Sequence, residues 1–114
     1  RIRALLNLDM ISRGERNTIF LEGAPDAPRI SLAINKANTK VGLHIIKNKH
    51  PEWLQRSDQA PFLERGVPSV FLSVEDHEDY HRVTDHTDKI LPDLAAKTAQ
   101  LSFLAAIDLA NGVP

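Results

Sequence analysis

Residues 68–74 read Pro-Ser-Val-Phe-Leu-Ser-Val, and this stretch decides the fold class. Its β-branched and aromatic residues predict a buried strand. Just before it, the pattern of residues 60–65 predicts a short helix that Gly66 and Pro68 bring to an end. Residues 92–110 predict a long helix with proline near its start and Asn-Gly at its end. A strand between helices is typical of an α/β layered domain.

The N-terminal part of the chain repeats the alternation of strand and helix. Short apolar runs predict strands over residues 4–10, 18–22 and 41–46. Asp26 is expected to cap a helix between the last two, whose apolar face is formed by Ile30, Ala33, Ile34 and Ala37. The pattern favours a mostly parallel sheet, in which functional side chains gather beyond the carboxyl ends of the strands. Asp9 and the loop after residue 74 are therefore expected on one rim.

Composition excludes several classes of function. The 114 residues are 42% apolar and 25% charged, with a net charge of −1, so no basic surface for nucleic acid is indicated. No apolar run approaches the roughly 20 residues that span a bilayer. With no cysteine, a metal ion would have to be bound by His, Asp or Glu. The chain opens without an initiator Met or a signal peptide, so we expect a piece of a longer protein.

Residues 75–88 form the richest cluster of candidate ligands. They hold six acids and three histidines against one arginine, a mixture of oxygen and imidazole donors that suits zinc. A solvated acidic loop is the alternative. Asp9, at the end of the first strand, is either a ligand on a rigid strand end or a cap for the next turn. His44 is interpreted as a packed or edge-strand histidine and His50 as a solvated one.

Two residues near His81 have a chemical and a structural interpretation each. Tyr80 is either a half-buried aromatic residue or a hydroxyl donor to a polarised carbonyl oxygen. Asp85, four residues after His81, either accepts the second ring N–H of that histidine or caps the following turn. Spacing alone does not choose between these roles.

Three segments together resemble the C-terminal half of the di-zinc aminopeptidases of metallopeptidase family twenty-eight. They are Asn7-Leu8-Asp9-Met10, then residues 57–68 (SDQAPFLERGVP), then residues 80–90 (YHRVTDHTDKI), in the family's order. The similarity runs from about Leu5 to Asn111. It implies a three-layer α/β/α fold of the phosphorylase/hydrolase type, with residues 1–114 forming the C-terminal part of one catalytic domain.

The resemblance also implies roles for single residues. Asp9 would bind one zinc ion of a pair and His81 the other, while Tyr80 would help to polarise the scissile carbonyl. Ser57 and Asp58 would pack near the site without a catalytic role. Gln59 and His86 depart from the family's pattern, which puts substrate preference in doubt. The family's Glu-Glu pair, which contains the general base, does not occur in this sequence, and the family's N-terminal HxD segment is expected in the missing half.

The implied parent is a zinc aminopeptidase that hydrolyses N-terminal peptide bonds with a zinc-activated water. On its own the chain is expected neither to bind two zinc ions tightly nor to turn over peptides, and to self-associate or pair with the missing half. Resemblance also suggests a periplasmic or secreted parent. The alternatives are a non-catalytic peptidase-like binding scaffold, or a relative of the carboxypeptidase or glutaminyl-cyclase type.

Overall fold

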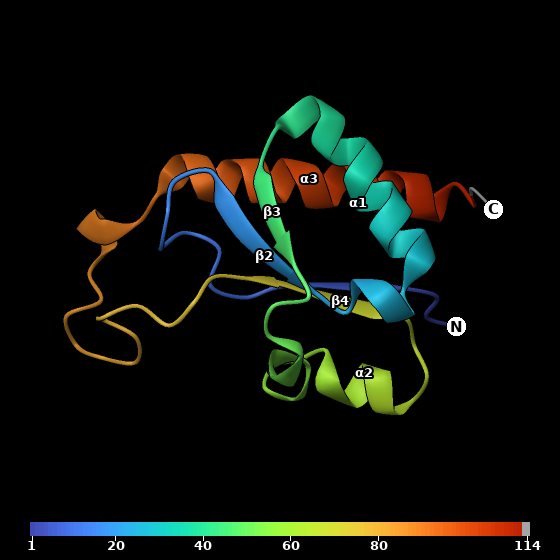
Figure 1. Cartoon of the computed structure of the whole chain (residues 1–114), viewed down its shortest axis with the longest axis horizontal. Coiled ribbons are helices and arrows are strands. Elements are labelled where there is room, and N and C mark those ends of the chain that lie inside the picture. The colour runs from blue at the N-terminus through green and yellow to red at the C-terminus, as the bar shows by residue number, and fades with distance from the viewer. Residues whose placement is uncertain (113–114) are drawn as a thin grey trace.

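The computed structural model describes residues 1–112 as an α/β domain with three layers (Figure 1). Four strands form one sheet: β1 (Leu5–Leu8), β2 (Thr18–Glu22), β3 (His44–Lys47) and β4 (Ser69–Ser73). The helices are α1 (Pro28–Val41), α2 (Ala60–Glu64) and α3 (Pro92–Ala110). Short 3₁₀ turns occupy Ala24–Asp26, Pro51–Gln55 and Thr87–Lys89. The predicted α/β class is confirmed.

The sheet runs in the order β1-β4-β2-β3 and consists of two parallel pairs joined antiparallel. β1 pairs with β4, and Leu8 lies opposite Leu72. β2 pairs with β3 in the same sense, but β2 and β4 run in opposite directions. The sheet is therefore mixed, where the sequence pattern predicted it mostly parallel. The carboxyl ends of β1 and β4 still share one edge, as the candidate site requires.

Alternate side chains of each strand face two different layers, as the pleat dictates. Leu21 and Leu72, fully buried, pack on one face beneath α1 and α3, which contact each other. Phe20, Phe71 and Trp53 form a smaller aromatic cluster on the opposite face. Trp53 comes from the 3₁₀ turn that precedes α2, so the 50–64 segment forms the third layer (Figure 1).

Two boundaries near α1 differ from their predictions. Asp26 lies in a 3₁₀ turn instead of capping the helix, and the N-cap residue is Ala27, with no side-chain cap. Pro28 can open the helix without a cap because it has no N–H to satisfy. At the other end, Gly42 adopts φ 78° and terminates α1 in a left-handed turn. The following strand therefore starts at His44 rather than at residue 41.

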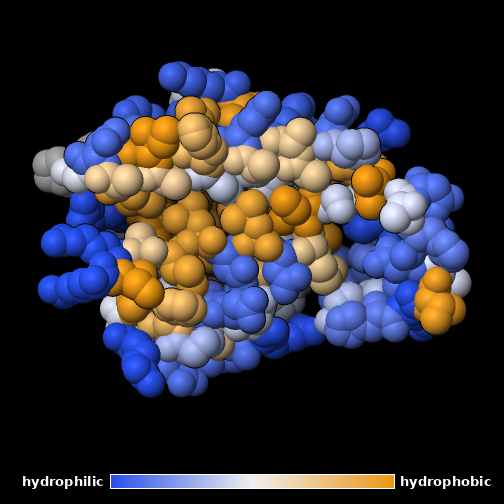
Figure 2. All heavy atoms as spheres, turned by 180° about the vertical axis from the view of Figure 1, so that it is seen from behind, coloured by the Kyte–Doolittle hydropathy of each residue, from blue (hydrophilic) through white to orange (hydrophobic). Residues whose placement is uncertain are grey.

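An apolar surface runs along α3 and over the sheet beside it, seen from behind in Figure 2. Phe103 and Ile107 on α3 are 56% and 44% exposed. β1 lies next to this surface as an edge strand, with β4 as its partner in the described sheet. Within residues 1–112, no helix is long and apolar enough to cross a membrane.

Candidate metal centre

Asp9 is the first residue beyond β1 and is held there by the sheet. Its backbone N–H donates to the Leu72 carbonyl at 3.2 Å, which extends the β1–β4 ladder by one bond. Met10 then adopts φ 65°, so the chain turns away directly after the carboxylate. Asp9 is exposed to solvent. A rigid strand end therefore presents this carboxylate at the rim of the sheet.

A chain of hydrogen bonds fixes one oxygen of the Asp9 carboxylate. The Ser57 hydroxyl donates to Asp9 Oδ2 at 2.7 Å and accepts from Asn7 Nδ2 at 3.0 Å. Asn7 Nδ2 also donates to Gln59 Oε1, and the Gln59 amide donates to the carbonyls of Trp53 and Leu54. The Ser57 bond is the only one that the carboxylate makes among residues 1–112. Oδ1 is therefore available to a ligand.

This network gives a structural role to residues for which the sequence predicted none. Ser57 and Gln59 belong to the segment predicted only to pack near the site. Gln59 is 0% exposed, so it supports the segment from below and does not contact substrate. Asn7 stands two residues before Asp9 and so projects from the same face of β1. That alternation was the one signal in the sequence that links Asn7 to the carboxylate.

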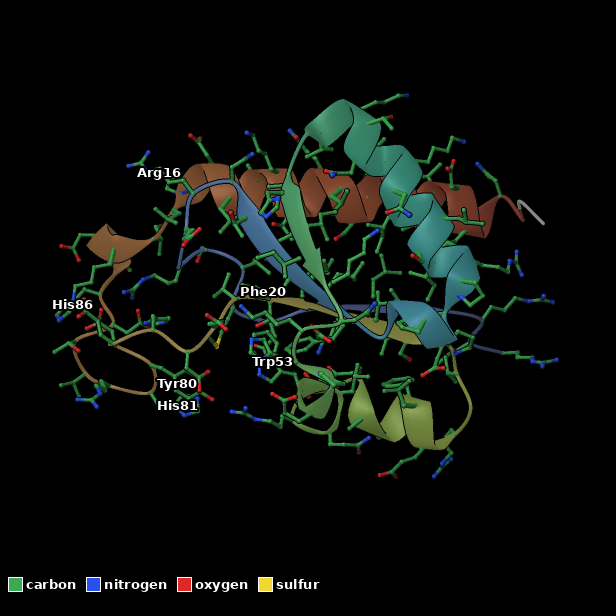
Figure 3. The ribbon with its side chains drawn as sticks, in the orientation of Figure 1. Arg16, Phe20, Trp53, Tyr80, His81 and His86 are labelled. Carbon is green, nitrogen blue, oxygen red and sulfur yellow. The ribbon has the colours of Figure 1, made fainter. Side chains whose placement is uncertain are left out.

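His81 lies on the long loop that leaves the carboxyl end of β4. Its ring stacks on Tyr80, with centroids 3.8 Å apart and planes 19° from parallel. The two rings lie together, and His86 lies farther out on the loop (Figure 3). His81 is exposed, and in the described part of the chain its ring nitrogens make no hydrogen bond. The imidazole is therefore free to bind a metal ion.

A small hollow of about 50 Å³ connects the strand end with the loop. Asp9 and Tyr80 both line it, although they are far apart in the sequence. Its other walls are mixed apolar and polar: Met10, Trp53, Arg56, Ser57, Phe71, Ser73, Val74 and Asp76. His81 stacks on Tyr80 but is not among the residues that line the hollow. Asp9 and Tyr80 therefore line the same hollow, and a common position of Asp9 and His81 stays a prediction.

A buried carboxylate anchors the loop from beneath. Asp79 is 4% exposed and forms ion pairs with Arg13 at 2.7 Å and with Lys89 at 3.0 Å. The Thr84 hydroxyl, Arg13 and Lys89 hold the pKa of the Asp79 carboxyl far below its usual value. Asp79 is therefore expected to be ionised at neutral pH.

The depressed pKa of Asp79 predicts a pH-dependent contribution to stability. Because the folded-state pKa is below the unfolded value of about 4, ionised Asp79 stabilises the fold fully above that pH and progressively less below it. Asp79→Asn is expected to lower the urea midpoint at pH 7, and the gap from the wild type is expected to narrow as the pH falls from 4 toward 2. Asp58→Asn, at an exposed acid, serves as the control. A gap that stays constant with pH contradicts this account.

Two other residues have partners that differ from the sequence-based interpretations. Asp85 accepts a hydrogen bond from Arg13 at 2.5 Å, so its carboxylate faces the loop after β1. No hydrogen bond joins it to His81 in residues 1–112, so a role as acceptor for that histidine stays a prediction for the metal-bound protein. His50 is not simply solvated: its ring stacks on Trp53 at 4.2 Å and pairs with Glu75 at 2.6 Å. His44 is exposed on the edge strand β3, as interpreted.

The donors at the rim fit zinc in kind but not in number. A carboxylate with a free oxygen and an unpaired imidazole are both zinc ligands. A catalytic zinc takes about three protein ligands, and residues 1–112 contain no group of three or more His, Asp or Glu placed to hold a metal ion. Any metal centre built on Asp9 and His81 therefore needs further ligands from outside this chain.

The fold and the rim define an α/β domain with candidate metal ligands beyond the ends of β1 and β4, and comparison with known proteins identifies its family. Residues 1–106 match peptidase family M28. The chain belongs to this family. No curated protein matches the sequence. Among solved structures, the LapA aminopeptidase of Legionella pneumophila superposes with a TM-score of 0.72 at 15% identity. The match covers 98% of this chain and 32% of LapA, so the chain spans about a third of the length of that structure.

Proposed function

We propose that this chain is part of the catalytic domain of a zinc aminopeptidase and contributes one ligand to each ion of a metal pair. Family membership over residues 1–106 supports hydrolysis of peptide bonds. The observation that carries the proposal is the hollow that Asp9 and Tyr80 both line, with His81 stacked on Tyr80. Peptides are the proposed substrates, and the remaining ligands and the general base come from another part of the protein.

The residues of this chain have separable tasks in that proposal. Asp9 would bind one ion through Oδ1 while Ser57 holds Oδ2, and His81 would bind the other ion through a ring nitrogen. When bound, zinc lowers the pKa of a coordinated water and polarises the substrate carbonyl. Tyr80 lines the same hollow, and its hydroxyl would donate a hydrogen bond to the developing oxyanion. Met10 and Trp53 would contact the side chain of the N-terminal residue.

The proposal is tested on the full-length protein and on the isolated chain in parallel. The full-length protein is expected to contain two zinc ions per molecule and to hydrolyse leucine-anilide substrates. The purified chain is expected to show neither two-site zinc binding in calorimetric titration nor turnover, because it supplies one ligand per ion. A full-length protein without zinc and without peptidase activity contradicts the proposal. Two tightly bound zinc ions and turnover in the isolated chain contradict the division of ligands.

The Ser57–Asp9 hydrogen bond is expected to affect metal binding. Partners that orient a metal ligand typically contribute about 10–100-fold in affinity or activity. Ser57→Ala in the full-length protein is therefore expected to lower zinc affinity by a factor in that range, measured by competition with a chelator. Ser31→Ala, at a half-buried serine on α1, is the matched control and is expected to leave affinity unchanged. Equal affinities for both variants would mean that Ser57 does not orient Asp9.

We further propose that the apolar surface formed by α3 and the edge strand β1 packs against the rest of the catalytic domain. Exposed edge strands pair readily with other strands, and large apolar patches mark protein contacts. The isolated chain is therefore expected to self-associate in light scattering, and Phe103→Lys with Ile107→Lys to reduce that association. Leu32→Lys, at a residue on α1 that is 69% exposed, is the control. A monodisperse monomer that binds no hydrophobic dye contradicts this proposal.

A further inference from the structure

We propose that Arg13 is a positioning residue that sets the placement of His81 relative to Asp9. The inference rests on the proposed function, since it concerns how two metal ligands on separate segments are brought into register. Arg13 lies four residues after Asp9, on the loop that leaves β1. Its guanidinium reaches across to the loop that leaves β4. One side chain therefore connects the two segments that carry the candidate ligands.

Arg13 bonds to two residues that flank His81 in the sequence, one before it and one after it. Nη2 donates to Asp79 at 2.7 Å and Nη1 donates to Asp85 at 2.5 Å. Asp79 precedes His81 by two residues and Asp85 follows it by four. The two ends of this short stretch are therefore fastened to the same planar group. A guanidinium presents its donors in a fixed fork, so it defines a geometry as well as a charge.

Burial makes this contact stronger than a surface ion pair. The side chain of Arg13 is 14% exposed and that of Asp79 is 6% exposed, whereas exposed pairs contribute little. Lys89 adds a second cation to Asp79 from the far end of the loop. The backbone N–H of Leu91 then donates to the Ser12 carbonyl at 2.6 Å. The loop after β4 thus contacts the loop after β1 at three positions. One is Asp79, which precedes His81, and the other two are Asp85 and Leu91, which follow it.

Backbone conformation shows why such fastening is needed. His81 has φ 53° and Met10 has φ 65°, so one candidate ligand and the neighbour of the other adopt the left-handed region. For residues with a Cβ this conformation is unfavourable and persists only where the surroundings enforce it. The stacking of His81 on Tyr80 is local to the loop and does not fix the loop relative to β1. The Arg13 fork supplies that connection.

The experiment compares Arg13→Lys and Arg13→Ala in the full-length protein with Arg16→Ala, an exposed arginine on the same loop (Figure 3). Lysine keeps the charge but donates as a point rather than as a fork. Arg13→Lys is expected to retain most of the wild-type urea midpoint yet to bind zinc about 10–100-fold more weakly and to lower kcat with little change in KM. Arg16→Ala is expected to match the wild type in all three measurements.

Hydrogen exchange on the same variants separates this inference from the proposed function. In Arg13→Ala, the amides of Arg82 and Asp85, which donate within the loop, are expected to exchange at least about tenfold faster, while those of β4 keep their protection. Unchanged exchange in the loop, or unchanged zinc affinity in both variants, overturns the role of Arg13. If the wild type binds no zinc but hydrogen exchange in the loop of Arg13→Ala is faster as expected, the proposed metal function is wrong. The inference that Arg13 holds this loop against the loop after β1 then still stands.

Discussion

Replacing Asp9 by Asn in the full-length protein is expected to reduce kcat/KM for a leucine-anilide substrate by about three orders of magnitude. A metal ion contributes several kcal/mol to stabilising the charge that develops in the transition state, and each 1.36 kcal/mol is about a factor of ten in rate. The same variant is expected to contain one zinc ion less per molecule. Among single substitutions in this chain, we expect Asp9→Asn to have the largest effect on activity.

The physical reason is the loss of charge with little loss of shape. Asparagine fits the space of Asp9 at the end of β1 and can still accept the Ser57 hydrogen bond through its amide oxygen. It brings no negative charge to a divalent cation and can turn its amide nitrogen toward the ligand position. The strand end, the ladder bond to Leu72 and the network behind Ser57 are expected to stay in place.

Controls for this variant come from the same rim. Asp58→Asn makes the same chemical change at an exposed acid of the neighbouring segment, and His86→Ala removes an exposed histidine from the loop of His81. Both are expected to keep zinc content and kcat/KM within about a factor of two, because neither residue contacts the hollow. Zinc content is read by elemental analysis and folding by circular dichroism. An Asp9→Asn enzyme with normal zinc and normal rate would exclude Asp9 as a ligand.

Local sequence patterns predicted the helices and strands. They did not predict the mixed strand directions of the sheet, which depend on long-range pairing. The bounds of β2 and α3 coincide with the predicted 18–22 and 92–110, because apolar runs, prolines and glycines act on near neighbours. The antiparallel junction of β2 and β4 has no local signature. It depends on which strand edges meet in the folded chain, where α1 and α3 pack on the same face of the sheet.

The candidate site shows the same division. Asp9 and the Tyr80–His81 pair were found from a strand end and a ligand-rich loop, and the resemblance to a family assigned their roles. The bond from Ser57, a residue expected only to pack near the site, and the role of Arg13 were not predicted, because their partners Asp9 and Asp79 lie 48 and 66 residues away. A hydroxyl and a guanidinium have many ordinary surface roles. Only their placement beside the candidate ligands distinguishes them.

Gln59→Leu is expected to cause the largest loss of stability among substitutions near the site. Gln59 is fully buried and serves three partners: its oxygen accepts from Asn7, and its amide donates to the carbonyls of Trp53 and Leu54. Leucine fills nearly the same volume, so the packing loss is small. The Trp53 carbonyl keeps the backbone N–H of Arg56 as a donor, so the Leu54 carbonyl is the group left without a partner. A buried polar group left unsatisfied costs about 1–3 kcal/mol, and we expect a loss of that size in the free energy of unfolding.

Urea unfolding of Gln59→Leu and of Gln55→Leu, an exposed glutamine of the same segment, measures this loss. Gln55→Leu is expected to change the free energy of unfolding by less than about 0.5 kcal/mol. Because Gln59 also supports Asn7 and through it Ser57, the same substitution is expected to weaken zinc binding in the full-length protein. A Gln59→Leu variant as stable as Gln55→Leu would show that water or a shift of the 53–60 backbone satisfies the Leu54 carbonyl. The hydrogen-bond path from the aromatic layer to Asp9 would then not depend on this amide.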